Sequence, residues 1–213
     1  MSKQSILASI RKNLDSNAHF NSHLGAEYRD VINIDNENLL ENYIALQKSN
    51  MAEVVISDPA NLAKDVVSVL KKQGAKELLC ALDLPFNIND LPQDEIKIIP
   101  YDKDVEEMRG SLFSIDSAIV KARCGVANLG TMGFVSSPKS PRLASLITPF
   151  CIMLLDKTKI YRNMFEALKF LKDTDGALPT NIFFIAGPSR TADIELKTVF
   201  GVHGPKATVT ILY

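Results

Sequence analysis

Residues 54–82, VVISDPANLAKDVVSVLKKQGAKELLCAL, decide the fold, because they read as a strand, a helix and a second strand. The β-branched run Val54-Val55-Ile56 predicts the first strand. Asp58-Pro59 then supplies a helix N-cap and a proline at the first helical position, and Gly74 ends the helix. Its predicted buried stripe consists of Leu62, Val66, Val69 and Leu70. The apolar run 78–82 predicts the second strand.

The alternation of strands and helices continues beyond this unit. Apolar runs predict strands at 96–99, 117–122, 134–135, 150–155, 182–185 and 208–213, and the spacing of Ile160, Met164, Leu168 and Leu171 predicts a helix. The run 150–155 is typical of a strand covered on both faces. The alternation of Thr with apolar residues at 208–213 suggests a half-exposed or edge strand. We therefore predict an α/β protein with a mostly parallel sheet and helices on both faces.

The first 50 residues have a different sequence pattern, which is typical of helices and rather polar. Ile6, Leu7, Ile10 and Leu14 fall on one face of a short helix, and a second helix is expected at about 36–48. No strand signal occurs in this part of the sequence. We predict an N-terminal helical arm over residues 1–50 and an α/β domain over residues 51–213.

Composition excludes several classes of function. The 213 residues include 24 Lys and Arg against 25 Asp and Glu, and this balance gives no general attraction to nucleic acid or to an anionic membrane. The sequence has neither an apolar signal-peptide core nor a stretch long enough to span a bilayer, so we expect a cytoplasmic protein. The three cysteines, Cys80, Cys124 and Cys151, form no C-x-x-C pair. We therefore expect no metal and no cofactor bound by this chain through the usual cysteine spacings.

A glycine-rich stretch follows the predicted strand at 117–122. Gly125, Gly130 and Gly133 lie within nine residues, which lets the backbone turn tightly and approach a ligand. Asn128 and Thr131 can form hydrogen bonds there. The spacing fits neither the dinucleotide fingerprint nor the phosphate loop. The alternative is a bulged hairpin, in which the glycines serve only the bend.

A second stretch, IAGPSRTADIE at 185–195, follows another predicted strand. Ser189 or Thr191 can cap a helix whose free N–H groups would make an anion site, and Arg190 can grip a carboxylate or phosphate beside it. Alternatively, the acidic side chains of the first turn satisfy the helix dipole, and Arg190 pairs with one of them. The ligand contacts that we expect in this stretch are Gly187, Ser189, Arg190, Thr191 and Asp193.

The remaining histidines and basic residues complete the candidates. His203 lies in the loop VFGVHGP at 199–205 and can act as an acid or base near neutral pH, or serve as a hydrogen-bonded structural residue. His19 and His23 lie in a polar loop and read as solvated residues, not as a metal pair. Lys139 and Arg142 either add positive charge beside the first glycine stretch or belong to a plain surface turn.

The runs 187–195 and 201–205 together resemble the C-terminal signature of the LUD-domain family. The resemblance extends over most of the chain and includes Gly130-Thr131. It implies a Rossmann-like fold of the sugar isomerase and CoA-transferase superfamily. It also implies a role in oxidising L-lactate to pyruvate beside two iron–sulfur partner proteins, which would carry the clusters. Family members often have a carboxylate and a Thr before the Gly-Thr pair, where this chain has Asn128 and Leu129.

Three functional hypotheses follow from these observations. The first is a subunit of the lactate-oxidising system, with a small anion bound by Gly130, Thr131 and the 187–193 stretch, and with His203 transferring a proton. The second is a stand-alone enzyme acting on a sugar phosphate or CoA ester. The third is a non-catalytic assembly or sensor protein.

Overall fold

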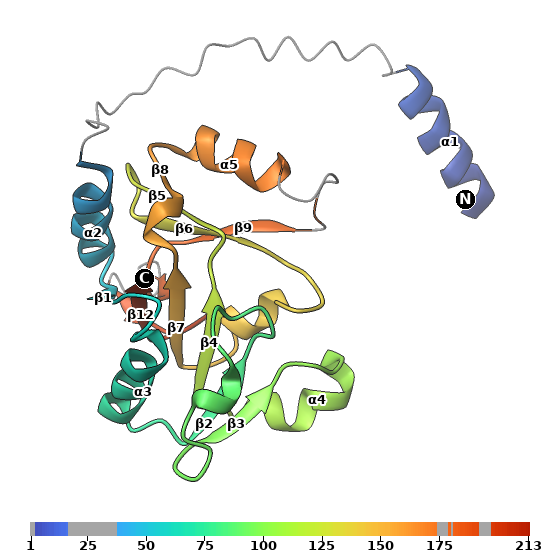
Figure 1. Cartoon of the computed structure of the whole chain (residues 1–213). Helices are drawn as coiled ribbons and strands as arrows, with labels where there is room; N and C mark the ends of the chain where they lie inside the picture. Colours follow the sequence, from blue (N-terminus) through green and yellow to red (C-terminus); the bar gives the residue numbers. More distant parts are fainter. Residues whose placement is uncertain (1–2, 17–37, 174–178, 180, 192–196) are drawn as a thin grey trace. The chain divides into compact units, whose positions relative to one another are not determined.

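The computed structural model describes residues 3–16, 38–173, 179, 181–191 and 197–213 (Figure 1). The chain divides into two compact units, Met1–Val31 and Ile32–Tyr213. The first unit contains helix α1 (Lys3–Ser16), on which Ile6, Leu7 and Ile10 are exposed. The second unit contains every other described element.

The second unit is built on a six-stranded sheet with the strand order β1-β12-β7-β4-β2-β3. Every adjacent pair of strands in it is parallel, which confirms the predicted mostly parallel sheet. The strands are β1 (Glu53–Ile56), β2 (Glu77–Cys80), β3 (Lys97–Pro100), β4 (Ser117–Lys121), β7 (Phe150–Leu155) and β12 (Ala207–Leu212).

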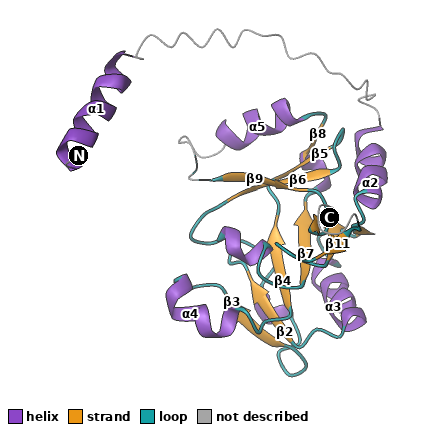
Figure 2. Cartoon of the chain, turned by 180° about the vertical axis from the view of Figure 1, so that it is seen from behind, coloured by secondary structure: helices purple, strands orange, loops and turns teal. Residues whose placement is uncertain are grey.

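Helices cover both faces of this sheet, as predicted (Figure 2). Successive residues of a strand point to opposite faces. Ile152 and Leu154 of β7 therefore pack in one core with α3 (Leu62–Gln73). Cys151, Met153 and Leu155 pack in the opposite core, with α2 (Leu39–Ser49) and α4 (Val105–Leu112). All of β7 is buried, in agreement with its uninterrupted apolar sequence.

A second, four-stranded sheet was not predicted from the sequence. Its order is β8-β5-β6-β9, with the pairs β5–β6 and β6–β9 antiparallel. Its strands are β5 (Cys124–Val126), β6 (Thr131–Val135), β8 (Ile160–Tyr161) and β9 (Ile182–Ile185). One side of this sheet packs on α5 (Met164–Asp173), and the other joins the core of the six-stranded sheet. Ile160 was wrongly assigned to a helix, because it pairs with Gly125 in β8 and α5 begins four residues later.

The last strand, β12, was wrongly expected at an edge or half exposed. It lies between β1 and β7, and both of its threonine side chains are buried. The Thr210 hydroxyl donates a hydrogen bond of 2.7 Å to Oε1 of Gln47 on α2. Thr210 therefore faces a buried amide instead of solvent, and the Thr208 hydroxyl is buried without a partner.

Helix α2 lies within the predicted arm of residues 1–50 and packs tightly on loops of the larger unit. The Gln47 side-chain amide donates to the carbonyl of Gly130, and that of Asn50 donates to Leu129 O at 3.0 Å. Gly130 has a φ of 57°, and a Cβ there would lie 2.6 Å from Leu46. Gly187 has a φ of 77°, and a Cβ there would lie 2.3 Å from the Asn50 carbonyl oxygen. Both glycines therefore allow these loops to approach α2 closely.

Candidate functional site

The described part of the stretch after β9 forms a two-stranded hairpin, where a helix capped by Ser189 was one of two predicted starts. The other predicted start, after Thr191, falls on residues 192–196, which lie outside the described residues. β10 (Arg190–Thr191) pairs in antiparallel fashion with β11 (Val199–Phe200), so Arg190 lies opposite Phe200. Ser189 as the N-cap of a helix is therefore wrong, and no anion site at a helix N-terminus forms directly after it. Asp193 belongs to residues 192–196, outside the described residues, and His19 and His23 lie outside them as well.

Ser189 joins the two C-terminal sequence motifs. Its backbone N–H donates to the carbonyl of Pro205 at 2.9 Å, and its own carbonyl accepts from the N–H of Gly201 at 3.0 Å. Its hydroxyl oxygen accepts a bond of 3.4 Å from the backbone N–H of His203. The structure thus brings together Ser189 and His203, two residues that the sequence analysis assigned to one site.

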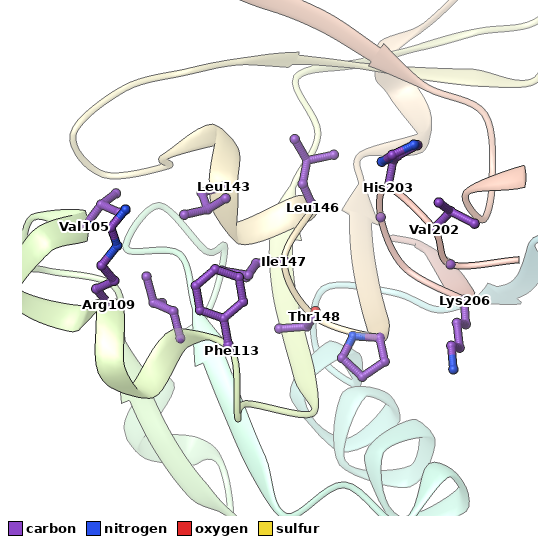
Figure 3. Close-up of a pocket in the computed structure, with 14 residues that line it drawn as sticks. Val105, Arg109, Phe113, Leu143, Leu146, Ile147, Thr148, Val202, His203 and Lys206 are labelled. Atoms are coloured by element: carbon purple, nitrogen blue, oxygen red, sulfur yellow. The ribbon is translucent and has the colours of Figure 1, made fainter. Parts of the chain in front are cut away.

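The loop that carries His203 forms one wall of a pocket of about 430 Å³, which we call the His203 pocket (Figure 3). Its lining residues are Val105, Arg109, Leu112, Phe113, Leu143, Leu146, Ile147, Thr148, Pro149, Gly201, Val202, His203, Gly204 and Lys206. Pro149 directly precedes β7, and Lys206 directly precedes β12. The pocket therefore lies at the amino ends of the parallel strands, although ligands of such sheets usually bind beyond the carboxyl ends.

The His203 pocket combines an apolar floor with basic side chains. Figure 3 shows Arg109 on one side and His203 with Lys206 on the other, separated by apolar side chains that include Phe113 and Leu146. Arg109 forms an exposed ion pair of 3.3 Å with Glu106, and ion pairs of this kind are weak. Such a lining suits an anion with an apolar part, and the imidazole beside it can exchange a proton.

The other predicted site residues lie elsewhere. Gly130 and Gly187 pack against α2, and Thr131 begins β6 with its hydroxyl buried and without a hydrogen-bond partner. Arg190 and Thr191 lie on β10, directly after Ser189, and do not line the pocket. The structure therefore divides the predicted site residues: His203 lines the pocket with Ser189 bonded to its backbone, Gly130 and Gly187 pack near α2, and Arg190 and Thr191 lie on β10.

Sequence reasoning missed the basic residues of the pocket. Lys206 directly follows the 201–205 motif, so its position at the motif's end was the available signal. Arg109 lies on α4, a helix that was not predicted. Its signal was Asp104 as N-cap followed by Glu106 and Glu107 in the first turn, a common helix start.

The cysteines are poorly suited to hold a cluster. Cys80, Cys124 and Cys151 are buried and free, and burial raises the pKa of each thiol to about 12. Since cysteine binds a metal ion or an iron–sulfur cluster as the thiolate, these protonated, buried side chains do not fit as ligands. Among the residues that the structure describes, no group of three or more His, Cys, Asp or Glu could hold a metal ion. No helix of that same part of the chain is long and apolar enough to cross a membrane.

Comparison with known proteins identifies relatives of this chain. The LUD domain model matches residues 40–213. An uncharacterized protein of Neisseria meningitidis is 36% identical over 122 residues, which cover 57% of this chain and 52% of that protein. Lactate utilization protein C of Shouchella clausii is 36% identical over 92 residues, covering 42% of this chain and 40% of that protein. Both matches thus span less than two thirds of the relative's length.

Two further similarities cover more of the chain. Lactate utilization protein C 1 of Bacillus mycoides is 25% identical over 191 residues, covering 83% of this chain and 81% of that protein. The crystal structure of a DUF162 family protein from Deinococcus radiodurans superimposes with a TM-score of 0.63 at 14% identity. That superposition covers 84% of this chain and 99% of the other, so the two proteins share a fold.

Proposed function

The chain belongs to the LUD-domain family, and we propose that it serves lactate utilization as a subunit of an iron–sulfur-dependent system that oxidises L-lactate to pyruvate in the cytoplasm. The relatives named lactate utilization protein C support this proposal. The observation that carries the assignment of the ligand site is the His203 pocket, where an imidazole, a lysine and an arginine surround an apolar floor.

In this proposal the carboxylate of a small anion binds between the basic side chains of the pocket. The ammonium group of Lys206 and the guanidinium group of Arg109 attract the negative charge, and the apolar floor takes the methyl group. The His203 imidazole accepts the hydroxyl proton as the substrate is oxidised. Ser189 holds the backbone of His203 in place. Arg190 adds a further positive charge on the exposed hairpin next to this loop.

The redox part of the reaction belongs to partner proteins. Oxidation of lactate to pyruvate releases two electrons and two protons, and an electron acceptor is needed. Since the buried thiols of this chain do not fit a cluster, we assign the iron–sulfur clusters to the partners. Affinity capture of the tagged chain from lactate-grown cells under anaerobic conditions tests this assignment. We expect co-purified iron–sulfur proteins whose visible absorption bleaches on addition of L-lactate, and a colourless chain without partners would contradict the assignment.

The ligand site is tested by isothermal titration of the purified chain with L-lactate. Lys206→Met keeps the aliphatic stem and removes the charge, and we expect binding to weaken by about tenfold or more, since a hydrogen bond to a charged group contributes about 1.5–3 kcal/mol. His203→Ala should lower lactate oxidation by the assembled system by about 100-fold or more, as for the loss of a general base. Lys169→Met, at an exposed position of α5, is the matched control. Equal affinities of the Lys206→Met and control variants would refute the site.

The size of the pocket favours one second candidate, a stand-alone enzyme acting on a CoA ester or sugar phosphate. A lactate-sized anion would fill only part of about 430 Å³, whereas a larger amphipathic anion would also cover the apolar wall formed by α4. A turnover screen of the purified chain with CoA thioesters and sugar phosphates distinguishes the two candidates. Turnover without partner proteins would favour the stand-alone enzyme.

A further inference from the structure

The His203 pocket is larger and more apolar than a lactate ion requires. Its volume is about 430 Å³, whereas lactate has a single methyl group to place against apolar side chains. Four of the large apolar side chains that line the pocket are exposed: Val105 at 43%, Phe113 at 78%, Leu146 at 37% and Val202 at 41%. Single exposed apolar side chains are common on protein surfaces, but a group of them around one pocket marks a binding surface.

Helix α4 supplies one wall of the pocket. Its apolar stripe continues from the buried core residues Met108 and Leu112 to Val105, and Arg109 lies one turn after Val105 on the same side of the helix. Phe113 directly follows the helix and lies in the middle of the lining in Figure 3. This wall can bury an apolar group, and the Arg109 guanidinium can stack on an aromatic one.

The opposite wall holds a lysine in a fixed position. Gly201 has a φ of 79°, and a Cβ there would overlap Cγ of Lys206, so the stem of this lysine packs directly over the glycine. The backbone N–H of Lys206 also donates to the carbonyl of Pro149 at 2.8 Å. These contacts fix the lysine on the His203 side of the pocket, away from α4 (Figure 3).

The positive charge of Lys206 and the apolar wall of α4 are therefore on different sides of the pocket. Figure 3 shows apolar side chains between Lys206 and Arg109, so a lactate ion bound at Lys206 leaves the α4 wall uncovered. A ligand with a longer apolar side chain reaches that wall and removes Phe113 and Val105 from water. Burial of each further methylene group strengthens binding about threefold to fourfold.

We infer that the His203 pocket takes 2-hydroxy acids whose side chain is larger than a methyl group, with a branched or aromatic group against Phe113 and the α4 wall. The carboxylate and the hydroxyl keep the places that lactate has in the proposed function, on which this inference rests. Phe113 and Leu146 determine specificity, because they contact the part of the ligand in which these acids differ.

Isothermal titration of the full chain tests this inference with four acids: L-lactate, L-2-hydroxyisocaproate, L-3-phenyllactate and 3-phenylpropionate. The branched and the aromatic hydroxy acid should each bind at least about tenfold more tightly than L-lactate. 3-Phenylpropionate has the ring but no hydroxyl, and it should bind about threefold more weakly than L-3-phenyllactate.

Each contrary result of this titration has a distinct meaning. Equal or tighter binding of L-lactate overturns the inference and leaves the proposed function standing. Equal binding of 3-phenylpropionate and L-3-phenyllactate overturns the assignment to hydroxy acids. Absence of binding by all four acids overturns both the inference and the ligand site of the proposed function.

Substitutions locate the aromatic group of the ligand. Phe113→Ser should reduce the ratio of the L-3-phenyllactate and L-lactate affinities to within about threefold. Phe165→Ser is the matched control and should keep the wild-type ratio, because Phe165 on α5 is also exposed and lies outside the pocket. Circular dichroism confirms that each variant is folded. An unchanged ratio in Phe113→Ser overturns the inference, and unchanged binding of every acid by Lys206→Met refutes the pocket itself.

Discussion

Replacing Gln47 by Met tests whether the buried amide of α2 holds the central strand β12. Gln47 is fully buried, and the substitution keeps the length of the side chain while it removes the amide oxygen and the amide nitrogen. The Thr210 hydroxyl then loses its acceptor and retains only Met132 Sδ, a weak acceptor at 3.8 Å. The carbonyl of Gly130 retains only the Asn50 amide at 3.3 Å.

The expected loss of stability comes from the Thr210 hydroxyl and the Gly130 carbonyl. A buried hydroxyl without a good partner costs about 1–3 kcal/mol, and the weakened bond to the carbonyl about 0.5–1.5 kcal/mol. We therefore expect Gln47→Met to lower the free energy of unfolding by about 2–4 kcal/mol, measured by urea denaturation. For a chain of this size the melting temperature should fall by about 4–16 °C.

A double-mutant cycle separates this hydrogen bond from other effects. Thr210→Val removes the hydroxyl, so the double variant Gln47→Met/Thr210→Val should be more stable than the sum of the two single losses predicts, by about 1 kcal/mol or more. Gln73→Met, at an exposed position on α3, is the surface control. If Gln47→Met stays within about 0.5 kcal/mol of that control, the reasoning is refuted.

Three further predictions concern backbone, charge and thiols. Gly187→Ala should lower the free energy of unfolding by at least about 1–3 kcal/mol, because φ is positive and the new Cβ would meet Asn50 O. Gly110→Ala in α4 meets open space and should raise it by about 0.5–1 kcal/mol. Thermal unfolding of both variants checks this contrast. Burial in the folded state raises the pKa of the Asp83 carboxyl, so its ionised form destabilises the fold. Asp83→Asn should therefore raise the free energy of unfolding at pH 7, by an amount that shrinks as the pH falls toward the ordinary pKa of about 3.9. Equal effects of the substitution at pH 7 and pH 4 would contradict this sign. The three thiols should stay unreactive toward a disulfide reagent in the native chain and react completely in guanidinium, because burial keeps them protonated; fast native labelling would show that they are accessible.

Part of the candidate site was predictable from sequence motifs. Ser189 and His203 belong to two motifs only a few residues apart, and the backbone hydrogen bonds between them confirm that they lie together. Gly130 and Gly187 were predicted as ligand contacts because they are glycines. A glycine, however, indicates only that a close approach or a positive φ is needed. Here the approaching partner is helix α2, so the same signal that suggested a ligand contact also marks packing.

The sequence by itself determined the elements whose signals are local. The strand-helix-strand unit at 54–82 and the buried strand β7 could be predicted, because periodicity and apolar runs act within about ten residues. Asp58 as the N-cap was wrong, since the helix begins at Leu62 and its N-cap is Asn61. Only the tertiary structure decided what depends on residues far apart in the chain. β12 is central because it pairs with both β1 and β7, and its Thr210 bonds to Gln47, 163 positions away in the sequence. Pairing and packing over such separations leave no local pattern, since many partners are compatible with one short segment.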